Sequence, residues 1–180
     1  MQGDYAYNLA TELFPICRSI TGDGVRQTLK ILQRELPDLK IHEVPSGTQV
    51  FDWTVPQEWN IMDAWVKDKS GKKIIDFAES NLHVMGYSVP VHKSLSLLEL
   101  MDIVYTEPDQ PDVIPYITSY YKERYGFCIS EHQKQQILRD YATDDKFEIC
   151  VDSTLKNGSL TYGELVIGAS VDSVRGGGWV

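Results

Sequence analysis

Residues 45–77 read PSGTQVFDWTVPQEWNIMDAWVKDKSGKKIIDF, and this stretch decides the fold. It opens with a turn at Pro45 and continues in aromatic runs, such as residues 59–65, that are typical of strands. Residues 69–72, Lys-Ser-Gly-Lys, predict a hairpin turn between two such runs. Residues 46–92 therefore indicate a small β-rich unit, which begins where the pattern of residues changes after Pro45.

The residues before this unit have a different pattern. Residues 5–17 and 25–36 carry apolar side chains at helical spacing, with Pro15 expected to end or bend the first helix. The polar, glycine-containing stretch 18–24 predicts a turn between them. Residues 39–44 alternate like a strand. Two helices followed by a strand are how many α/β hydrolase domains begin.

Two capping boxes predict short helices in the second half of the chain. Ser96-x-x-Glu99 opens a helix through Met101, and Ser130-x-x-Gln133 opens one that ends near residue 140.

The end of the chain is again β-like. Residues 147–151 alternate between apolar and polar side chains, which is typical of a half-buried strand. Asn157-Gly158 predicts a hairpin turn, because both residues tolerate positive φ, and residues 160–167 are the expected partner strand. The glycines of 175–178 predict a loose tail.

Composition excludes several classes of protein. The chain has 180 residues, 42% of them hydrophobic, which is enough for a packed domain and excludes the disordered class. A formal net charge of −9 disfavours binding to nucleic acid or to an anionic membrane surface. The N-terminus has no signal-peptide pattern, and no apolar run approaches the ~18 residues of a membrane span. We expect a cytoplasmic protein.

The cysteines and histidines form no recognisable metal motif. Three widely spaced cysteines, without a Cys-x-x-Cys, favour reduced thiols. Cys128 precedes a predicted helix and His132 follows it closely, so a Cys128 nucleophile is a weak hypothesis beside a buried structural thiol. None of the histidines stands in a zinc-binding spacing, which favours surface or hydrogen-bonded roles over a metal site. They are His42, His83, His92 and His132.

A loop over residues 80–90 is the most unusual polar stretch. It brings Asn81, His83 and Tyr87 together with a glycine and a proline, and such loops often carry ligand contacts. The alternative is that these side chains satisfy the backbone groups of the loop itself. We take Asn81, His83 and Tyr87 as candidate ligand-binding residues.

Several longer strings together resemble a known family. They include Arg18-Ser-Ile-Thr-Gly-Asp-Gly-Val-Arg26, Glu43-Val-Pro-Ser-Gly-Thr48 continuing to Asn60, Asp76 to His83, Ile114 to Tyr121 and Gly158-Ser-Leu-Thr-Tyr-Gly-Glu164. In this order they resemble the bacterial aminopeptidase-like family of the co-catalytic zinc aminopeptidase clan, in which domain of unknown function 4910 carries an inserted domain of unknown function 2172. The resemblance covers residues 5–167.

The resemblance implies an incomplete zinc-aminopeptidase-like α/β domain with a smaller, inserted β-rich domain. Residues 1–45 would begin the α/β domain, residues 46–145 would form the insertion, and residues 146–167 would return to the α/β domain. Residues 168–180 would be an atypical glycine-rich tail. Family members carry their zinc ligands after the last matched strand, so no catalytic or metal-binding residue can be carried over to this chain.

Two functional hypotheses follow. The first is an N-terminal fragment of a zinc-dependent aminopeptidase-like hydrolase, inactive alone, with zinc and a peptide or amine-bearing substrate expected for the full-length form. The second is a non-catalytic module that binds a sugar or peptide, linked by the resemblance to surface-polysaccharide biosynthesis. A truncated sheet would expose strand edges, so we also expect self-association.

Overall fold

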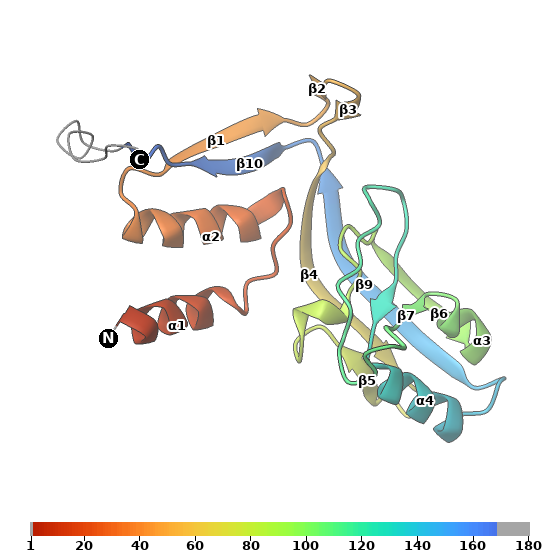
Figure 1. Ribbon diagram of the computed structural model, residues 1–180. Helices are drawn as coiled ribbons and strands as arrows, with labels where there is room; N and C mark the ends of the chain where they lie inside the picture. The colour runs from red at the N-terminus through yellow and green to blue at the C-terminus, as the bar shows by residue number, and fades with distance from the viewer. Residues whose placement is uncertain (1, 169–180) are drawn as a thin grey trace, which may run out of the picture.

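A computed structural model describes residues 2–168 and arranges their helices and strands in two groups (Figure 1). In the first group, α2 (Gly22–Glu35) lies along a two-stranded antiparallel ribbon of β1 (Lys40–Pro45) and β10 (Ser159–Glu164), and α1 (Gln2–Leu13) lies on the other side of α2. Leu29 of α2 is buried near the ribbon, and its side chain, like that of Leu39, lies close to Gly163 of β10. This mixture of helix and strand agrees with the predicted α/β class.

The second group is built on a four-stranded antiparallel sheet with the order β5-β4-β9-β6. Its strands are β4 (Glu58–Lys67), β5 (Lys73–Asp76), β6 (Val91–Ser96) and β9 (Lys146–Lys156). Along β9 every second side chain from Phe147 to Ser153 is buried, as the alternating pattern predicts. The β4–β5 hairpin expected around residues 69–72 is also confirmed.

Short elements complete the core of this second group. They are η1 (Asn81–His83), α3 (Leu97–Met101), α4 (Glu131–Asp140) and the parallel pair β7 (Val104–Tyr105) and β8 (Phe127–Cys128). Both predicted helix starts are confirmed: the Ser96 hydroxyl accepts the Glu99 backbone N–H, and the Ser130 hydroxyl accepts that of Gln133. The core gathers buried side chains from the sheet, α3, α4 and β8, among them Val66, Leu100, Phe127, Ile137, Phe147 and Ile149.

The two helices of the first group differ from their predicted bounds. α1 ends at Leu13, because a residue that precedes proline is disfavoured in the helical conformation and Pro15 follows closely. α2 begins at Gly22, so the glycines of the expected turn form the first turn of the helix. The first of the aromatic runs, which sequence composition favours as a strand, is instead a tight hairpin of β2 (Gln49–Val50) and β3 (Trp53–Thr54).

The predicted hairpin between β9 and β10 is wrong. β9 pairs with β4 along one edge and with β6 over residues 146–151 of the other, while β10 leaves this sheet and pairs with β1 instead. Gly158 is needed for space rather than for positive φ, since a Cβ there would lie 2.3 Å from Glu58 Oε2. The chain turns there between two separate sheets.

Residues 146–156 form β9, which lies in the same sheet as β4, β5 and β6. The domain boundaries at residues 45, 145 and 167 stay predictions. The predicted tail over 175–178 lies outside the described residues. Within residues 2–168, no helix combines the length and the apolar run that crossing a bilayer requires.

Candidate functional site

Five residues connect α2 to the start of β4, and we call Thr21, Gly22, Arg26, Glu58 and Trp59 the joint. The buried Thr21 hydroxyl accepts the backbone N–H of Trp59 at 3.0 Å. Gly22 has φ +87°, and a Cβ at this position would lie 2.2 Å from the carbonyl oxygen of Trp59. A side chain at residue 22 therefore has no room.

An ion pair between Arg26 and Glu58 also holds α2 against the start of β4. The Glu58 carboxylate accepts two hydrogen bonds from Arg26, at 3.0 and 2.5 Å, and one from the backbone N–H of Ser159 at 3.2 Å. The guanidinium, followed by the Ser159 N–H, lowers the pKa of Glu58 to about 2 against partial burial. One carboxylate thus links α2, β4 and the turn before β10.

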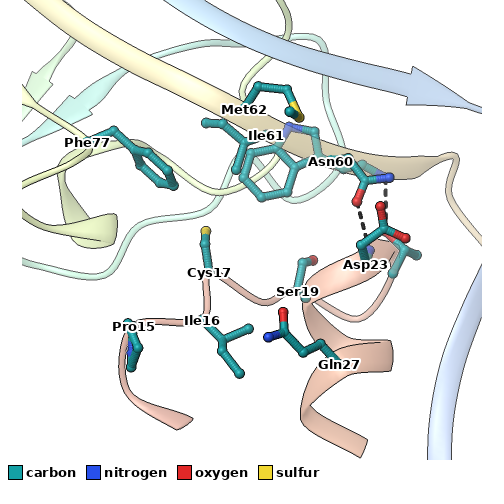
Figure 2. A pocket seen from close by; sticks show the side chains of 13 residues that line it. Pro15, Ile16, Cys17, Ser19, Asp23, Gln27, Asn60, Ile61, Met62 and Phe77 are labelled. Carbon is teal, nitrogen blue, oxygen red and sulfur yellow. Dashed lines mark hydrogen bonds between the residues drawn. The ribbon is translucent and has the colours of Figure 1, made fainter. Parts of the chain in front are cut away.

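A pocket of about 450 Å³ adjoins the joint (Figure 2). Figure 2 shows Ile61 and Phe77 on one side of the space, with Cys17 and Gln27 across from them. Asn60 lies at the rim and accepts the Asp23 backbone N–H at 2.7 Å. A lining of mostly apolar groups with a few amide and hydroxyl groups is typical of small-molecule sites.

The sequence alone does not identify this pocket. Residues 18–26 and the strand that starts at Glu58 stand out as distinctive strings, but their patterns predict a turn and an ordinary strand. Gln27, Asn60 and Phe77 come from three different segments, so their meeting depends on the tertiary fold. The sequence feature that could have indicated the contact beside this pocket is the glycine pair of Gly22-Asp-Gly24, because glycine permits a close approach of two backbones.

The three predicted ligand-binding residues are not brought together. Asn81 lines a separate pocket of about 230 Å³, and its amide donates to the Phe14 carbonyl at 3.4 Å. His83 is buried, with Nδ1 2.8 Å from the Cys128 carbonyl oxygen. Tyr87 is also buried, stacks on Trp59 and places its hydroxyl 2.6 Å from Thr21 Oγ1. Ligand binding by these residues stays a prediction.

The placement of His83 and Asn81 gives opposite expectations for stability. We expect His83→Ala to lower the free energy of unfolding by about 2 kcal/mol, because it leaves a buried carbonyl unpaired and opens a space. We expect Asn81→Ala to change it by less than ~0.5 kcal/mol, since the bond is long and near the surface. Urea denaturation followed by tryptophan fluorescence measures both. Equal effects would mean that His83 is not a structural residue.

The cysteines are free thiols in the structure. Cys128 is fully buried, and burial raises its pKa to about 11, so the thiol is protonated at neutral pH. This corrects the hypothesis of a Cys128 nucleophile. Burial also raises the pKa of the half-buried Cys17 and Cys150.

Thiol labelling tests this arrangement. With Ellman's reagent at about pH 7.5, we expect Cys128 to react only after unfolding, and Cys17 and Cys150 to react slowly in the native chain. The variant Cys17→Ser/Cys150→Ser isolates the signal of Cys128. Rapid labelling of that native variant would restore the nucleophile hypothesis.

Each histidine faces its own neighbour. His42 Nε2 lies 3.0 Å from Glu164, His92 Nε2 lies 2.7 Å from Glu148, and His132 Nδ1 lies 3.0 Å from Asp112. Together with His83, these pairs are dispersed over different strands and loops. Across residues 2–168, no three His, Cys, Asp or Glu side chains converge closely enough to hold a metal ion.

Comparison with known proteins places the chain in a family. Residues 58–154, more than half of the chain, match the Domain of unknown function (DUF2172). A Clostridium acetobutylicum protein named "Putative polysaccharide biosynthesis protein with aminopeptidase-like domain" is 56% identical over 165 residues, 92% of this chain and 37% of that protein. A crystal structure of a "putative peptidase" from the same organism aligns with a TM-score of 0.82 at 56% identity, over 90% of this chain and 37% of that one. The chain thus spans just over a third of the length of these relatives, and it belongs to the DUF2172 family.

Proposed function

We propose that the chain is the N-terminal segment of a zinc-dependent aminopeptidase-like hydrolase, and that it supplies framework rather than catalytic groups. The observation that carries this proposal is the 56% identity, over 92% of the chain, to a protein with an aminopeptidase-like domain. In the terms of the resemblance, the first group of elements would begin the hydrolase domain, numbered 4910 among domains of unknown function. The DUF2172 part would be inserted into it.

The described residues do not fit a zinc site. Zinc in a hydrolase needs at least three His, Asp, Glu or Cys ligands that converge on one point, with a position left open for water. The four histidines of the chain each face a separate neighbour instead. The ligands of a zinc centre would therefore come from outside residues 2–168, and none of these residues is assigned a catalytic step.

The surface of α1 supports a partner for this segment. Arg34 of α2 holds Glu12 of α1 through two hydrogen bonds, at 2.9 and 2.7 Å, while Tyr7 and Phe14 leave 74% and 80% of their area exposed. We propose that the remaining part of the hydrolase covers this face, because the matched span is only 37% of each relative. Without that part we expect the chain to self-associate, which sedimentation velocity at increasing concentration measures.

The substrate and the location are proposals as well. A peptide or an amine-bearing small molecule is the substrate that an aminopeptidase-like domain would take, and a cytoplasmic location is consistent with the acidic composition and the reduced thiols. A second candidate function, a non-catalytic sugar- or peptide-binding module, draws support from a pocket that Tyr87 lines together with Tyr121.

Zinc content and peptidase activity test the main proposal. The purified 180-residue chain and the intact Clostridium acetobutylicum relative would be dialysed against zinc, analysed by plasma mass spectrometry and assayed with aminoacyl p-nitroanilides. We expect bound zinc and hydrolysis for the relative, and neither for the chain. Stoichiometric zinc in the chain, or a relative without zinc and without activity, would contradict the proposal.

A further inference from the structure

A pocket of about 320 Å³, lined by none of the five joint residues, lies where the segment after β3 meets the loops around Tyr87 and Tyr121. Aliphatic side chains of Val55, Val89 and Leu155 form part of its lining. Its volume is within the range of pockets that enclose a small ligand.

Aromatic rings form one wall of this pocket. The rings of Tyr87 and Tyr121 meet edge to face with centroids 4.6 Å apart, and Trp53 approaches Tyr121 at 6.0 Å. Tyr121 keeps 39% of its area exposed, while the neighbouring Tyr120 is 77% exposed. Tyr87 and Trp53 therefore support the Tyr121 ring, and part of that ring is open to a ligand.

The backbone at these tyrosines is in a costly conformation. Tyr87, Tyr120 and Tyr121 have φ values of 63°, 53° and 67°, in the left-handed region that bulky residues rarely adopt. Each such residue costs on the order of 1 kcal/mol, and a glycine would avoid that cost. Residues held in this way cluster at binding sites, which suggests that the rings here serve a ligand as well as the fold.

Three polar side chains that line the pocket form no polar contact with the rest of the described chain. In the part of the chain that the structure describes, Gln57, Lys122 and Glu123 make no side-chain hydrogen bond or ion pair. Together they offer amide, ammonium and carboxylate groups, hence both donors and acceptors. The charges of Lys122 and Glu123 cancel, so the pocket favours a neutral ligand.

We propose that this pocket binds a neutral carbohydrate of one or two hexose units. The C–H face of a sugar ring packs on an aromatic ring, and its hydroxyl groups both donate and accept hydrogen bonds, which matches the Tyr121 ring and the polar rim. A peptide added as a strand would need free backbone groups at the pocket edge. Those of Val55 already pair with Thr48 and Gly47.

The test titrates the full 180-residue chain with cellobiose, maltose and N,N′-diacetylchitobiose, followed by ¹⁵N–¹H NMR. We expect at least one disaccharide to give saturable shifts that include Tyr121 and Trp53, with a dissociation constant of about 0.1–10 mM. Tyr121→Ala and Gln57→Ala should each weaken binding about tenfold. Tyr116→Ala, which removes an exposed tyrosine outside this pocket, should leave binding unchanged.

Absence of saturable shifts with all three sugars up to ~50 mM would overturn the proposal, as would binding that neither Tyr121→Ala nor Gln57→Ala weakens. Gln57 is exposed and its side chain forms no hydrogen bond within the described residues, so Gln57→Ala keeps the test valid if the Tyr121→Ala variant does not fold. The inference rests on the second candidate function. It is independent of zinc, so the failure of one proposal is distinguishable from that of the other.

Discussion

Gly22→Ala is expected to unfold the chain or to lower its free energy of unfolding by at least ~3 kcal/mol. The added Cβ would lie 2.2 Å from the carbonyl oxygen of Trp59 and 2.7 Å from Asn60 Oδ1. Neither atom can move freely, because Trp59 is paired with Leu155 inside the sheet and Asn60 accepts the Asp23 N–H. The substitution would separate the start of α2 from β4.

Gly47→Ala is the matched control. Gly47 has almost the same backbone, with φ +86°, but a Cβ added there would meet no atom within 4 Å. Its cost is the left-handed backbone alone, about 1 kcal/mol. Guanidinium denaturation of both variants separates backbone strain from steric exclusion. If the two variants lose equal stability, the joint is not closely packed at Gly22.

Glu58→Gln is expected to lower the free energy of unfolding by about 2 kcal/mol at neutral pH. It should also make the free energy of unfolding less dependent on pH in the acidic range. The glutamine keeps the shape of the side chain but loses the charge that faces Arg26. Glu58 leaves 16% of its side chain exposed and Arg26 leaves 26%, so solvent weakens this pair less than a surface pair.

The pH range follows from the pKa of Glu58. Folding lowers that pKa from 4.5 to about 2, so the folded state favours the ionised carboxylate. The stabilisation is present above the unfolded pKa of 4.5 and is lost as the pH falls through about 2, below which both states are protonated. The difference in stability between the native chain and Glu58→Gln should therefore shrink over this range.

Glu43→Gln provides the control for charge. Glu43 also faces Arg26, but at 3.9 Å and with 52% of its side chain exposed, so its removal should have a much smaller effect. Denaturation curves from about pH 7 to about pH 2.5 measure all three proteins. A difference between the native chain and Glu58→Gln that stays constant over this whole range would contradict the role of this ion pair.

Local features of the fold can be predicted from the sequence because neighbouring residues determine them. The serines at residues 96 and 130 cap the helices that follow, and the hydrophobic alternation of β9 marks its buried face. The predicted pairing of β10 is wrong because strand pairing depends on distant residues as well as on the turn. Asn157-Gly158 has the composition of a hairpin turn, but β10 pairs with β1, which lies far away in the sequence. A pairing between such distant segments is not visible along the chain.

The sites depend still more on distant contacts. Asn81 and Tyr87 are close in sequence, yet they line two different pockets, and His83 turns inward to a backbone carbonyl. Side chains that are close in sequence within a short loop can point in different directions. The tertiary packing determines the direction of each one. Tyr121, which contacts Tyr87, comes from a different segment of the chain, so its position beside Tyr87 depends on the tertiary fold.

The most direct measurement of the framework role is a transplant. The matched part of the Clostridium acetobutylicum relative would be replaced by the aligned residues of this chain, and zinc content and aminopeptidase activity would be compared with those of the intact relative. If the chain is the framework of an aminopeptidase-like hydrolase, the chimera binds zinc and keeps activity within about tenfold, whereas Gly22→Ala in the chimera abolishes both. A folded chimera without zinc or activity, beside an active relative, would contradict that role.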